Sequence, residues 1–301
     1  MRGARTGSPL FLLLDIPFFR QYNNFHPTFI SFKKERTMEF FLNEILENEE
    51  IKKQLLTERE KYPEAAEIAA DIRANGARPD LAPGMLPLLV LSHLADDALR
   101  INEEKGVPRE ITVATLKDIN IWIENHRQLT GERGVMEFLW LLHHFRGDLF
   151  RLGRLQFRIA KSIPGAPGEY AIETHIPQGS PLNAEECLAS FAMARDFFAR
   201  YFPQYAPKCF TCHSWLLSPD FAKILDEESN IVRFMRLWIQ APCKPDDSRQ
   251  AIQRAFGLNF SREQLENAPE NTRLQRALKA HLLSGGALNA GAGYRLLDAG
   301  E

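Results

Sequence analysis

The spacing of apolar residues changes near Gly147, and this change constrains the fold more than any other feature of the sequence. From Met38 up to this point, apolar side chains recur about every 3.6 residues, as on one face of an α-helix. Beyond it, apolar and polar residues alternate, as in a strand with one buried face. We therefore predict an α+β protein, with a helical domain over residues 38–147 and a mixed β-sheet domain flanked by helices over residues 148–301.

Proline and glycine residues divide the helical half, because proline suits the first turn of a helix and glycine the residue after its end. The first helical stretch includes Phe41 to Leu56. The predicted helices that follow cover residues 63–75, 85–104, 108–129 and 135–145.

The second half begins with a predicted hairpin of residues 150–160 and 169–176. The alternation changes phase at Gly153-Arg154, which we interpret as a β-bulge. Asn183 is a suitable N-cap for a helix over residues 184–201. Further along the chain we predict strands at residues 209–217, 231–240 and 294–297 and helices at residues 219–225, 247–256 and 271–283.

Residues 1–37 form a separate segment in which Asp15 and Pro17 interrupt the apolar stretch, so a signal peptide is disfavoured. The residues Lys33-Lys-Glu-Arg-Thr37 directly precede Met38, and Lys-Glu codons can form a purine-rich ribosome-binding sequence. We interpret Met38 as the start and residues 1–37 as a translated leader. The alternative is a flexible N-terminal arm.

Composition excludes several classes of protein. The formal net charge of −2 gives no basic surplus for nucleic acid, and the 4 cysteines are too few for a disulfide framework. No apolar run approaches the roughly 20 residues needed to cross a bilayer. We predict a soluble cytoplasmic protein that binds neither nucleic acid nor membranes; its oligomeric state stays open.

Four segments carry a resemblance to a known family: Phe150-Arg-Leu-Gly-Arg-Leu-Gln-Phe157, His175-Ile-Pro-Gln-Gly179, Cys212-His-Ser-Trp-Leu-Leu217, and Ser229-Asn-Ile-Val-Arg-Phe234. Together they resemble bacterial acyltransferase-domain proteins, which have an N-acyltransferase-type helical N-terminal domain and a GNAT-like C-terminal domain. The resemblance implies an N-acyltransferase that uses acyl-CoA or acetyl-CoA and a small-molecule or peptide amine. The alternative is a GNAT-like binding module without turnover.

The resemblance also implies a phosphate-binding loop between the strand at residues 170–176 and the following helix. GNAT enzymes typically place an Arg/Gln-x-x-Gly-x-Gly/Ala loop here, whereas this loop has one glycine and a proline, Pro181. We expect Gln178, Gly179 and Ser180 to hold the CoA phosphates, together with the N–H groups at the start of the helix.

Amide formation needs a base to deprotonate the incoming ammonium, and two residues of the strand at residues 170–176 suit this role. Glu173 and His175 share the face opposite Tyr170 and Ile172. We predict His175 as the first candidate base and Glu173 as the second. The alternative is that both are polar residues on a solvated face.

The segment Cys209-Phe-Thr-Cys-His213 matches the c-type haem motif, and both cysteines with His213 and His175 would suit zinc. We expect neither haem nor metal, because the segment reads as a strand and no export signal is evident. His213 and Ser214 are candidate lining or catalytic residues, and Cys212 is expected to be a small buried apolar residue.

Two other groups are expected to be structural. His143 and His144, consecutive on an apolar helix, should serve packing or capping. Arg154 is expected at the surface, with phosphate binding as the alternative.

Overall fold

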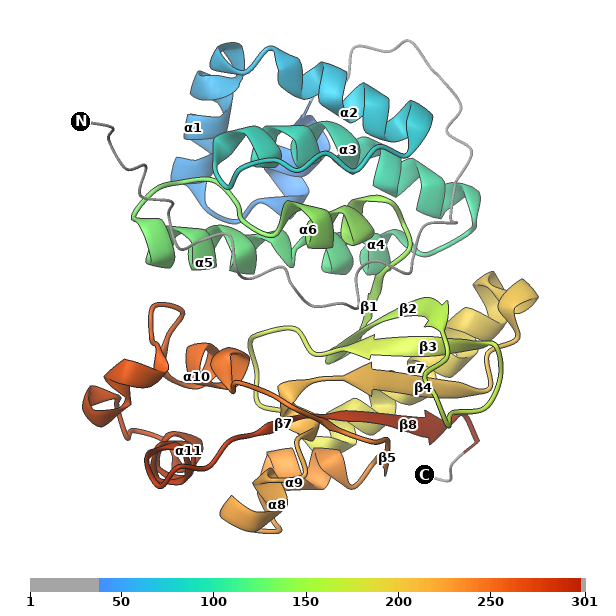
Figure 1. Ribbon diagram of the computed structural model, residues 1–301. Coiled ribbons are helices and arrows are strands. Elements are labelled where there is room, and N and C mark those ends of the chain that lie inside the picture. The colour runs from blue at the N-terminus through green and yellow to red at the C-terminus, as the bar shows by residue number, and fades with distance from the viewer. Residues whose placement is uncertain (1–37, 299–301) are drawn as a thin grey trace, which may run out of the picture.

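The computed structural model describes residues 38–298, which form a helical domain packed on a second domain built around a β-sheet (Figure 1). The predicted α+β class is confirmed. The leader proposed for residues 1–37 lies outside the described residues. None of the described helices is long and apolar enough to cross a membrane.

The helical domain opens with a π-helical turn, Phe41–Ile45, and continues through α-helices that wrap around α3. Their bounds are α1 (Glu49–Glu58), α2 (Glu64–Asn75), α3 (Met85–Glu104), α4 (Arg109–Leu116), α5 (Ile119–Thr130) and α6 (Phe138–Phe145). α3 is largely buried because apolar residues occupy most of its circumference, including Leu88, Leu91 and Leu94. Gly76 ends α2 with a φ of 64°, a left-handed conformation that glycine adopts without steric cost.

The prediction of one helix over residues 108–129 is wrong, because the chain breaks between α4 and α5 at Lys117 and Asp118. Here the N–H of Asp118 bonds to the carbonyl of Thr115, in a turn tighter than an α-helix. The carboxylate of Asp118 turns inward and accepts a hydrogen bond from Trp122 Nε1 at 3.0 Å. The break thus places a buried carboxylate opposite α6.

The second domain holds a six-stranded sheet in the order β1-β2-β3-β4-β8-β5, in which only β3 and β4 are parallel. A two-stranded sheet pairs β6 with β7. The strands are β1 (Phe150–Leu152), β2 (Leu155–Lys161), β3 (Tyr170–His175), β4 (Cys209–His213), β5 (Ile239–Gln240), β6 (Lys244–Pro245), β7 (Asn289–Ala290) and β8 (Ala292–Leu296). The helices are α7 (Ala184–Tyr201), α8 (Phe221–Ile224), α9 (Asn230–Met235), α10 (Arg249–Phe256) and α11 (Arg273–Leu283).

The predicted bulge at Gly153-Arg154 is instead a tight turn between β1 and β2. Leu152 pairs with Leu155 across it, and Gly153 has a φ of 68°. Partners directly across a hairpin share a face, so a two-residue turn produces the phase change seen in the sequence.

Two strands were predicted too long. The strand predicted at residues 209–217 ends at His213, because Ser214 caps a 3₁₀ turn over Trp215–Leu217. The strand predicted at residues 231–240 is mostly the helix α9, with only Ile239–Gln240 in a strand. The β-branched and aromatic residues of α9 favour a strand. The Ser229 side chain nevertheless caps the start of the helix by accepting a hydrogen bond from the Val232 N–H.

The sheet lies between two layers (Figure 1). α7 covers one face, where Phe191 packs against Phe210 with ring centroids 4.9 Å apart. The predicted N-cap is confirmed, since Asn183 Oδ1 accepts from the N–H groups of Glu185 and Glu186. The other face is turned toward the helical domain.

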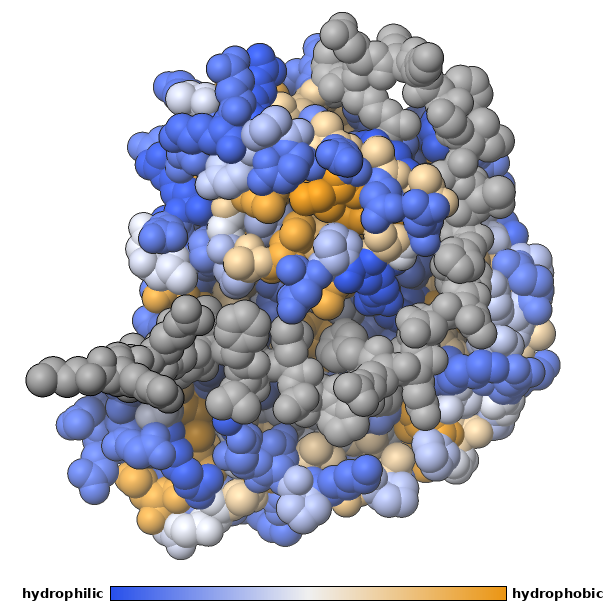
Figure 2. Space-filling view, turned by 45° about the horizontal axis from the view of Figure 1, so that its top comes forward, coloured by the Kyte–Doolittle hydropathy of each residue, from blue (hydrophilic) through white to orange (hydrophobic). Residues whose placement is uncertain are grey.

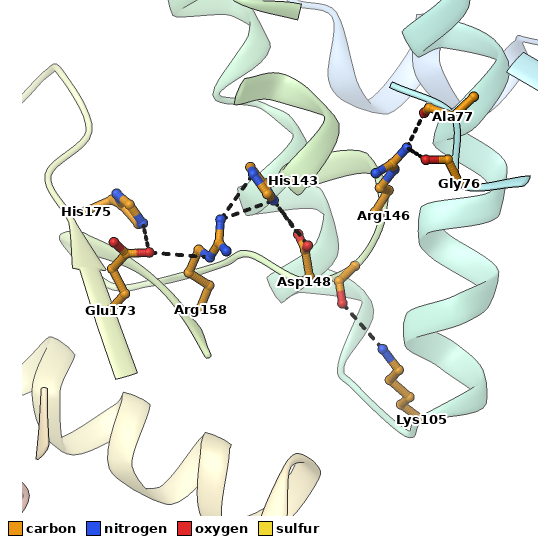
Figure 3. Close-up of polar contacts among 10 residues, drawn as sticks. Gly76, Ala77, Lys105, His143, Arg146, Asp148, Arg158, Glu173 and His175 are labelled. Carbon is orange, nitrogen blue, oxygen red and sulfur yellow. Dashed lines mark hydrogen bonds and ion pairs between the residues drawn. The ribbon is translucent and has the colours of Figure 1, made fainter. Parts of the chain in front are cut away.

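A short connector, residues 146–149, joins the two domains and is tied to the helical one at both sides (Figure 3). Arg146 donates to the carbonyls of Gly76 and Ala77, and Lys105 Nζ donates to the carbonyl of Gly147 at 3.3 Å. The loop after α3 also places Val107 in the apolar core of the sheet domain. The two domains are therefore joined by hydrogen bonds at the connector and by the packing of Val107 in the core of the sheet domain.

The face of the molecule seen in Figure 2 is mostly hydrophilic, with an apolar area in its upper part and smaller ones elsewhere. Underneath, each domain has a separate apolar core. Polar side chains are concentrated between the cores, where the sheet meets α6.

Candidate active site

The candidate site lies where the pairing of the parallel strands β3 and β4 ends. Their pairing joins Ile172 to Phe210, Glu173 to Thr211 and Thr174 to Cys212, and stops there. The strands end one residue later, at His175 and His213 respectively. Because Glu173 is paired with Thr211, the histidines that follow two residues later project from the same face of the sheet. The sequence therefore predicted two side chains that the fold brings to neighbouring strand ends.

Glu173 and His175 form a close pair on the sheet face turned toward the helical domain. Nε2 of His175 lies 3.3 Å from Oε2 of Glu173. Burial alone would raise the pKa of Glu173, but His175 and Arg158 favour its charged form and lower that pKa to about 2. Glu173 is 5% exposed, so the alternative of a solvated face is wrong for this residue. A buried, ionised carboxylate thus orients a partly exposed imidazole.

Trp140 from α6 forms the wall that faces His175. Its ring centroid lies 4.7 Å from that of His175, and the two rings meet edge to face. The same indole contacts His143 and His144, with centroids 5.8 Å and 5.5 Å away. The helical domain therefore contributes directly to the surroundings of the candidate base.

A chain of polar contacts continues from Glu173 across the domain boundary (Figure 3). Arg158 Nε lies 3.4 Å from Glu173 Oε2, and Arg158 Nη1 lies 3.1 Å from His143 Nε2. His143 Nδ1 lies in turn 3.1 Å from Asp148 Oδ2. Arginine can only donate, so Nε2 of His143 accepts and Nδ1 carries the hydrogen toward Asp148. Burial lowers the pKa of His143, which agrees with a neutral ring.

His144 belongs to a second polar group beside this chain. Its Nε2 lies 3.2 Å from Asp118 Oδ2 and 3.4 Å from the side-chain amide of Gln156. Both histidines of α6 therefore make the packing contacts that were expected, and they also carry polar links between the domains.

His213 and Ser214 occupy different environments at the end of β4. His213 is exposed at the surface, although nearby protein atoms remove part of its hydration. This desolvation lowers its pKa, and the charge of Glu173 opposes the shift. The Ser214 hydroxyl accepts from the Leu216 N–H at 3.2 Å and so caps the 3₁₀ turn. Its hydrogen remains available as a donor.

The loop from Gln178 to Asn183 follows β3 and leads into α7. Arg154 lies behind it and donates to the carbonyls of Pro177, Ser180 and Pro181 at 3.0, 2.8 and 3.3 Å. At 8% exposure Arg154 is buried, so the surface position expected for it is wrong. Its guanidinium turns the loop carbonyls inward and fixes the path of the chain.

The start of α7 offers fewer free donors than the sequence suggested. Asn183 already binds the N–H groups of Glu185 and Glu186, and both of these residues add negative charge to the first turn. Gly179 remains open to a ligand: it has a φ of 137°, and a side chain there would meet no atom within 4 Å.

The cysteines do not assemble a metal site. Cys209 and Cys212 have opposite parity on β4 and face opposite sides of the sheet. Burial raises the pKa of the Cys212 thiol, so it is a poor nucleophile and packs as the expected small apolar residue. Within residues 38–298, no group of three or more His, Cys, Asp or Glu residues is arranged to hold a metal ion.

Sequence reasoning missed three residues that complete the site, namely Trp140, Arg158 and Asp148. One signal was present: Gln156 and Arg158 alternate with apolar residues on β2, as Glu173 and His175 do on β3. Paired strands with matching polar positions predict a polar face. The sequence alone could not show that this face is covered by α6.

Comparison with known proteins identifies both domains. Residues 30–147 match the N-acyltransferase N-terminal domain, and residues 149–295 match the GNAT-like C-terminal domain. No curated protein matches the sequence significantly.

Solved structures of an acyltransferase share the whole arrangement. The complex with decanoyl-CoA is 25% identical with a TM-score of 0.72, and the complex with decanoyl-CoA and teicoplanin is 24% identical with a TM-score of 0.74. A mutant acyltransferase in complex with octanoyl-CoA is also 24% identical, with a TM-score of 0.73. In each comparison the match covers 86% of this chain and 87% of the other. This chain therefore consists of an N-acyltransferase N-terminal domain followed by a GNAT-like C-terminal domain, and its fold is similar to that of the solved acyltransferase.

Proposed function

We propose that this protein is an acyl-CoA-dependent N-acyltransferase, which moves an acyl group from a CoA thioester to the amine of an acceptor. The observation that carries the proposal is the Glu173–His175 pair at the point where the pairing of β3 and β4 ends, 3.3 Å from Oε2 to Nε2. We expect the thioester to bind beyond the last paired residues of β3 and β4, where this pair places a base. The similar structures solved with octanoyl-CoA and decanoyl-CoA support an acyl-CoA donor.

His175 acts in this scheme as the general base. Its Nε2 faces Glu173, so Nδ1 is the nitrogen left to accept a proton from the acceptor ammonium. The freed amine attacks the thioester carbon, and a C–N bond forms as the C–S bond breaks. The CoA sulfur leaves as a thiolate and takes up the second proton, which the attacking nitrogen loses as the amide forms. His175 releases the first proton to solvent, so the products are an amide, CoA thiol and one proton.

Glu173 is a positioning residue. Its carboxylate holds the imidazole in one orientation and stabilises the imidazolium that forms during proton transfer. We further propose that His213 and the Ser214 hydroxyl line the opposite strand end. For the donor, Gln178, Gly179 and Ser180 are proposed to contact the phosphates of CoA, because this loop leads directly from the base to α7.

The acceptor is a small-molecule or peptide amine. One similar acyltransferase structure contains teicoplanin, a glycopeptide, which makes it a useful trial acceptor. No metal or haem is assigned a role in this scheme.

A second candidate is a ligand-binding module without turnover. The capping of α7 by Asn183 favours it, because two N–H groups that would bind phosphate are already used. Such a module would bind acyl-CoA without releasing its thiol.

Thermal shift and thiol release together test the proposal. CoA and decanoyl-CoA should raise the melting temperature, because a ligand that binds only the native state stabilises it. Free thiol should then appear when decanoyl-CoA is supplied with teicoplanin or a lysine peptide. The His175→Ala variant should keep the thermal shift and lose thiol release by roughly 100-fold or more. Absence of any shift contradicts the proposal, and a shift without release for any amine supports the binding module.

A further inference from the structure

Arg254 is an arginine in the sheet domain that the proposed reaction does not yet use. It lies near the end of α10 and is exposed. Its guanidinium lies over the ring of Trp122, 5.6 Å from the centroid, and its Nη1 donates to Gln178 Oε1 at 3.3 Å. Gln178 Oε1 also accepts a hydrogen bond from Asn125 Nδ2 at 3.3 Å. Arg254 therefore stands directly beside the first residue of the loop that follows β3.

Within residues 38–298, Glu137 and Asp118 act on this guanidinium by their charge and not through a hydrogen bond. Surrounding atoms lower the pKa of Arg254 by desolvation, while Glu137 and Asp118 oppose this only from a longer distance. Guanidinium has five N–H donors, and the contact with Gln178 uses one of them. The remaining N–H groups are therefore available to an anion that binds beside this loop.

The loop beside Arg254 lacks the charge expected of a phosphate site. Two donors at the start of α7 are used by Asn183, and Glu185 and Glu186 repel an anion there. Arg154 lies behind the loop and is occupied by three backbone carbonyls. Arg254, which contacts Gln178, thus supplies a positive charge beside this loop.

We propose that Arg254 binds the pyrophosphate of the CoA donor, at Gln178 and Gly179, and compensates for the capped start of α7. The inference rests on the proposed function, because it requires acyl-CoA beside the ends of β3 and β4. Trp122 holds the guanidinium flat by stacking, and Gln178 directs one edge, so the remaining N–H groups form a fork that matches two phosphate oxygens. α5 of the helical domain thereby helps to select a donor bound mainly by the sheet domain.

Calorimetric titration of the full-length protein tests this assignment. The titrants are CoA, dephospho-CoA, which lacks the 3′-phosphate, and decanoyl-pantetheine, which lacks all phosphates. Arg254→Ala should weaken the binding of CoA and of dephospho-CoA by about ten-fold or more, the loss expected for a hydrogen bond to a charged group. The affinity for decanoyl-pantetheine should not change. The dependence of CoA affinity on salt should also become shallower in this variant.

Two variants serve as controls. Arg276→Ala removes an exposed arginine of α11 that contacts only the Glu270 carbonyl, and it should leave all three affinities unchanged. Gln178→Ala removes the hydrogen-bond acceptor of Arg254 and should weaken CoA binding less than Arg254→Ala does. Equal losses for these two variants would mean that Arg254 acts only by holding Gln178, which overturns the inference.

The other outcomes are equally decisive. Wild-type affinity of Arg254→Ala for CoA overturns the inference and leaves the proposed function intact, and so does an equal loss for decanoyl-pantetheine. A loss for CoA but not for dephospho-CoA moves the contact to the 3′-phosphate and overturns the pyrophosphate assignment. If the wild-type protein binds none of the three compounds, the proposed function itself fails.

Discussion

The ring of Trp140 in the helical domain packs edge to face on that of His175 in the sheet, with centroids 4.7 Å apart. This contact makes the candidate site composite, because the base and its aromatic wall come from different domains. The indole also contacts His143 and His144, so one side chain packs against both the candidate base and the polar residues of α6.

Trp140→Ala should therefore lower both stability and turnover. Loss of the indole leaves a cavity against His175 and should reduce the free energy of unfolding by about 3 kcal/mol. Trp140→Phe keeps an aromatic edge at this position and serves as the control. Denaturant unfolding and thiol release measure the two effects, and wild-type turnover in a folded Trp140→Ala protein would argue against the composite site.

Glu173 should make stability depend on acid pH. Its pKa is about 2 in the folded protein against an ordinary value of 4.5, so it binds protons more readily when unfolded. Its contribution is then fully present above about pH 4.5 and is lost as pH falls through about 2. At 1.36 kcal/mol per pKa unit the contribution is at most about 3 kcal/mol.

Comparison with Glu173→Gln isolates this effect from that of the other carboxylates. The free energy gap between wild type and variant, measured by urea unfolding, should narrow as pH falls from 5 toward about 2. A gap that stays constant over this range would show that Glu173 is not held as an anion.

Arg158 and Glu173 should be coupled, because each compensates the charge of the other at low exposure. Arg158→Met leaves a buried carboxylate without its guanidinium and should cost about 3 kcal/mol or more. Adding Glu173→Gln removes that charge, so the double variant should be more stable than the sum of the single losses predicts. Additive losses in a double-mutant cycle would contradict the coupling.

Gly179→Val should block CoA binding while the protein still folds. A side chain at Gly179 meets no protein atom within 4 Å, so it would project into the space proposed for the donor. Its φ of 137° adds backbone strain, which Gly285→Val controls for, since Gly285 has a φ of 88° and open surroundings. Calorimetry should find CoA binding lost only in Gly179→Val; normal binding there would place the donor elsewhere.

Much of the fold could be predicted because local signals were strong. The bounds of α3 and α7 agree with the sequence prediction, since α3 has a long apolar face and α7 has Asn183 at its start. α9 was mistaken for a strand because a short run of β-branched and aromatic residues fits either period. The break before α5 depends on Asp118 meeting Trp122 and α6, and no local pattern encodes that contact.

The residues of the candidate site also differ in how far the sequence could predict them. Glu173 and His175 were predicted because they are two residues apart on one strand, where alternation determines the shared face. Arg158 reaches His143 across a hairpin and a domain boundary, and Arg254 reaches Gln178 from a helix far along the chain. Such pairs depend on how separate elements pack, which a single sequence does not reveal.

The connector between the domains has a practical consequence for recombining such proteins. Hydrogen bonds of Arg146 and Lys105 hold it to the helical domain. Val107 of the helical domain packs in the core of the sheet domain, and His143 accepts a hydrogen bond from Arg158 across the boundary. A chimera divided at residues 146–149 would therefore lose the contacts of Arg146 and Lys105, the packing of Val107 and the contact between His143 and Arg158. Transferring residues 138–175 as one block keeps His143 with Arg158. Lys105 and Val107 stay behind in such an exchange, so the recipient protein must supply compatible residues at these two positions.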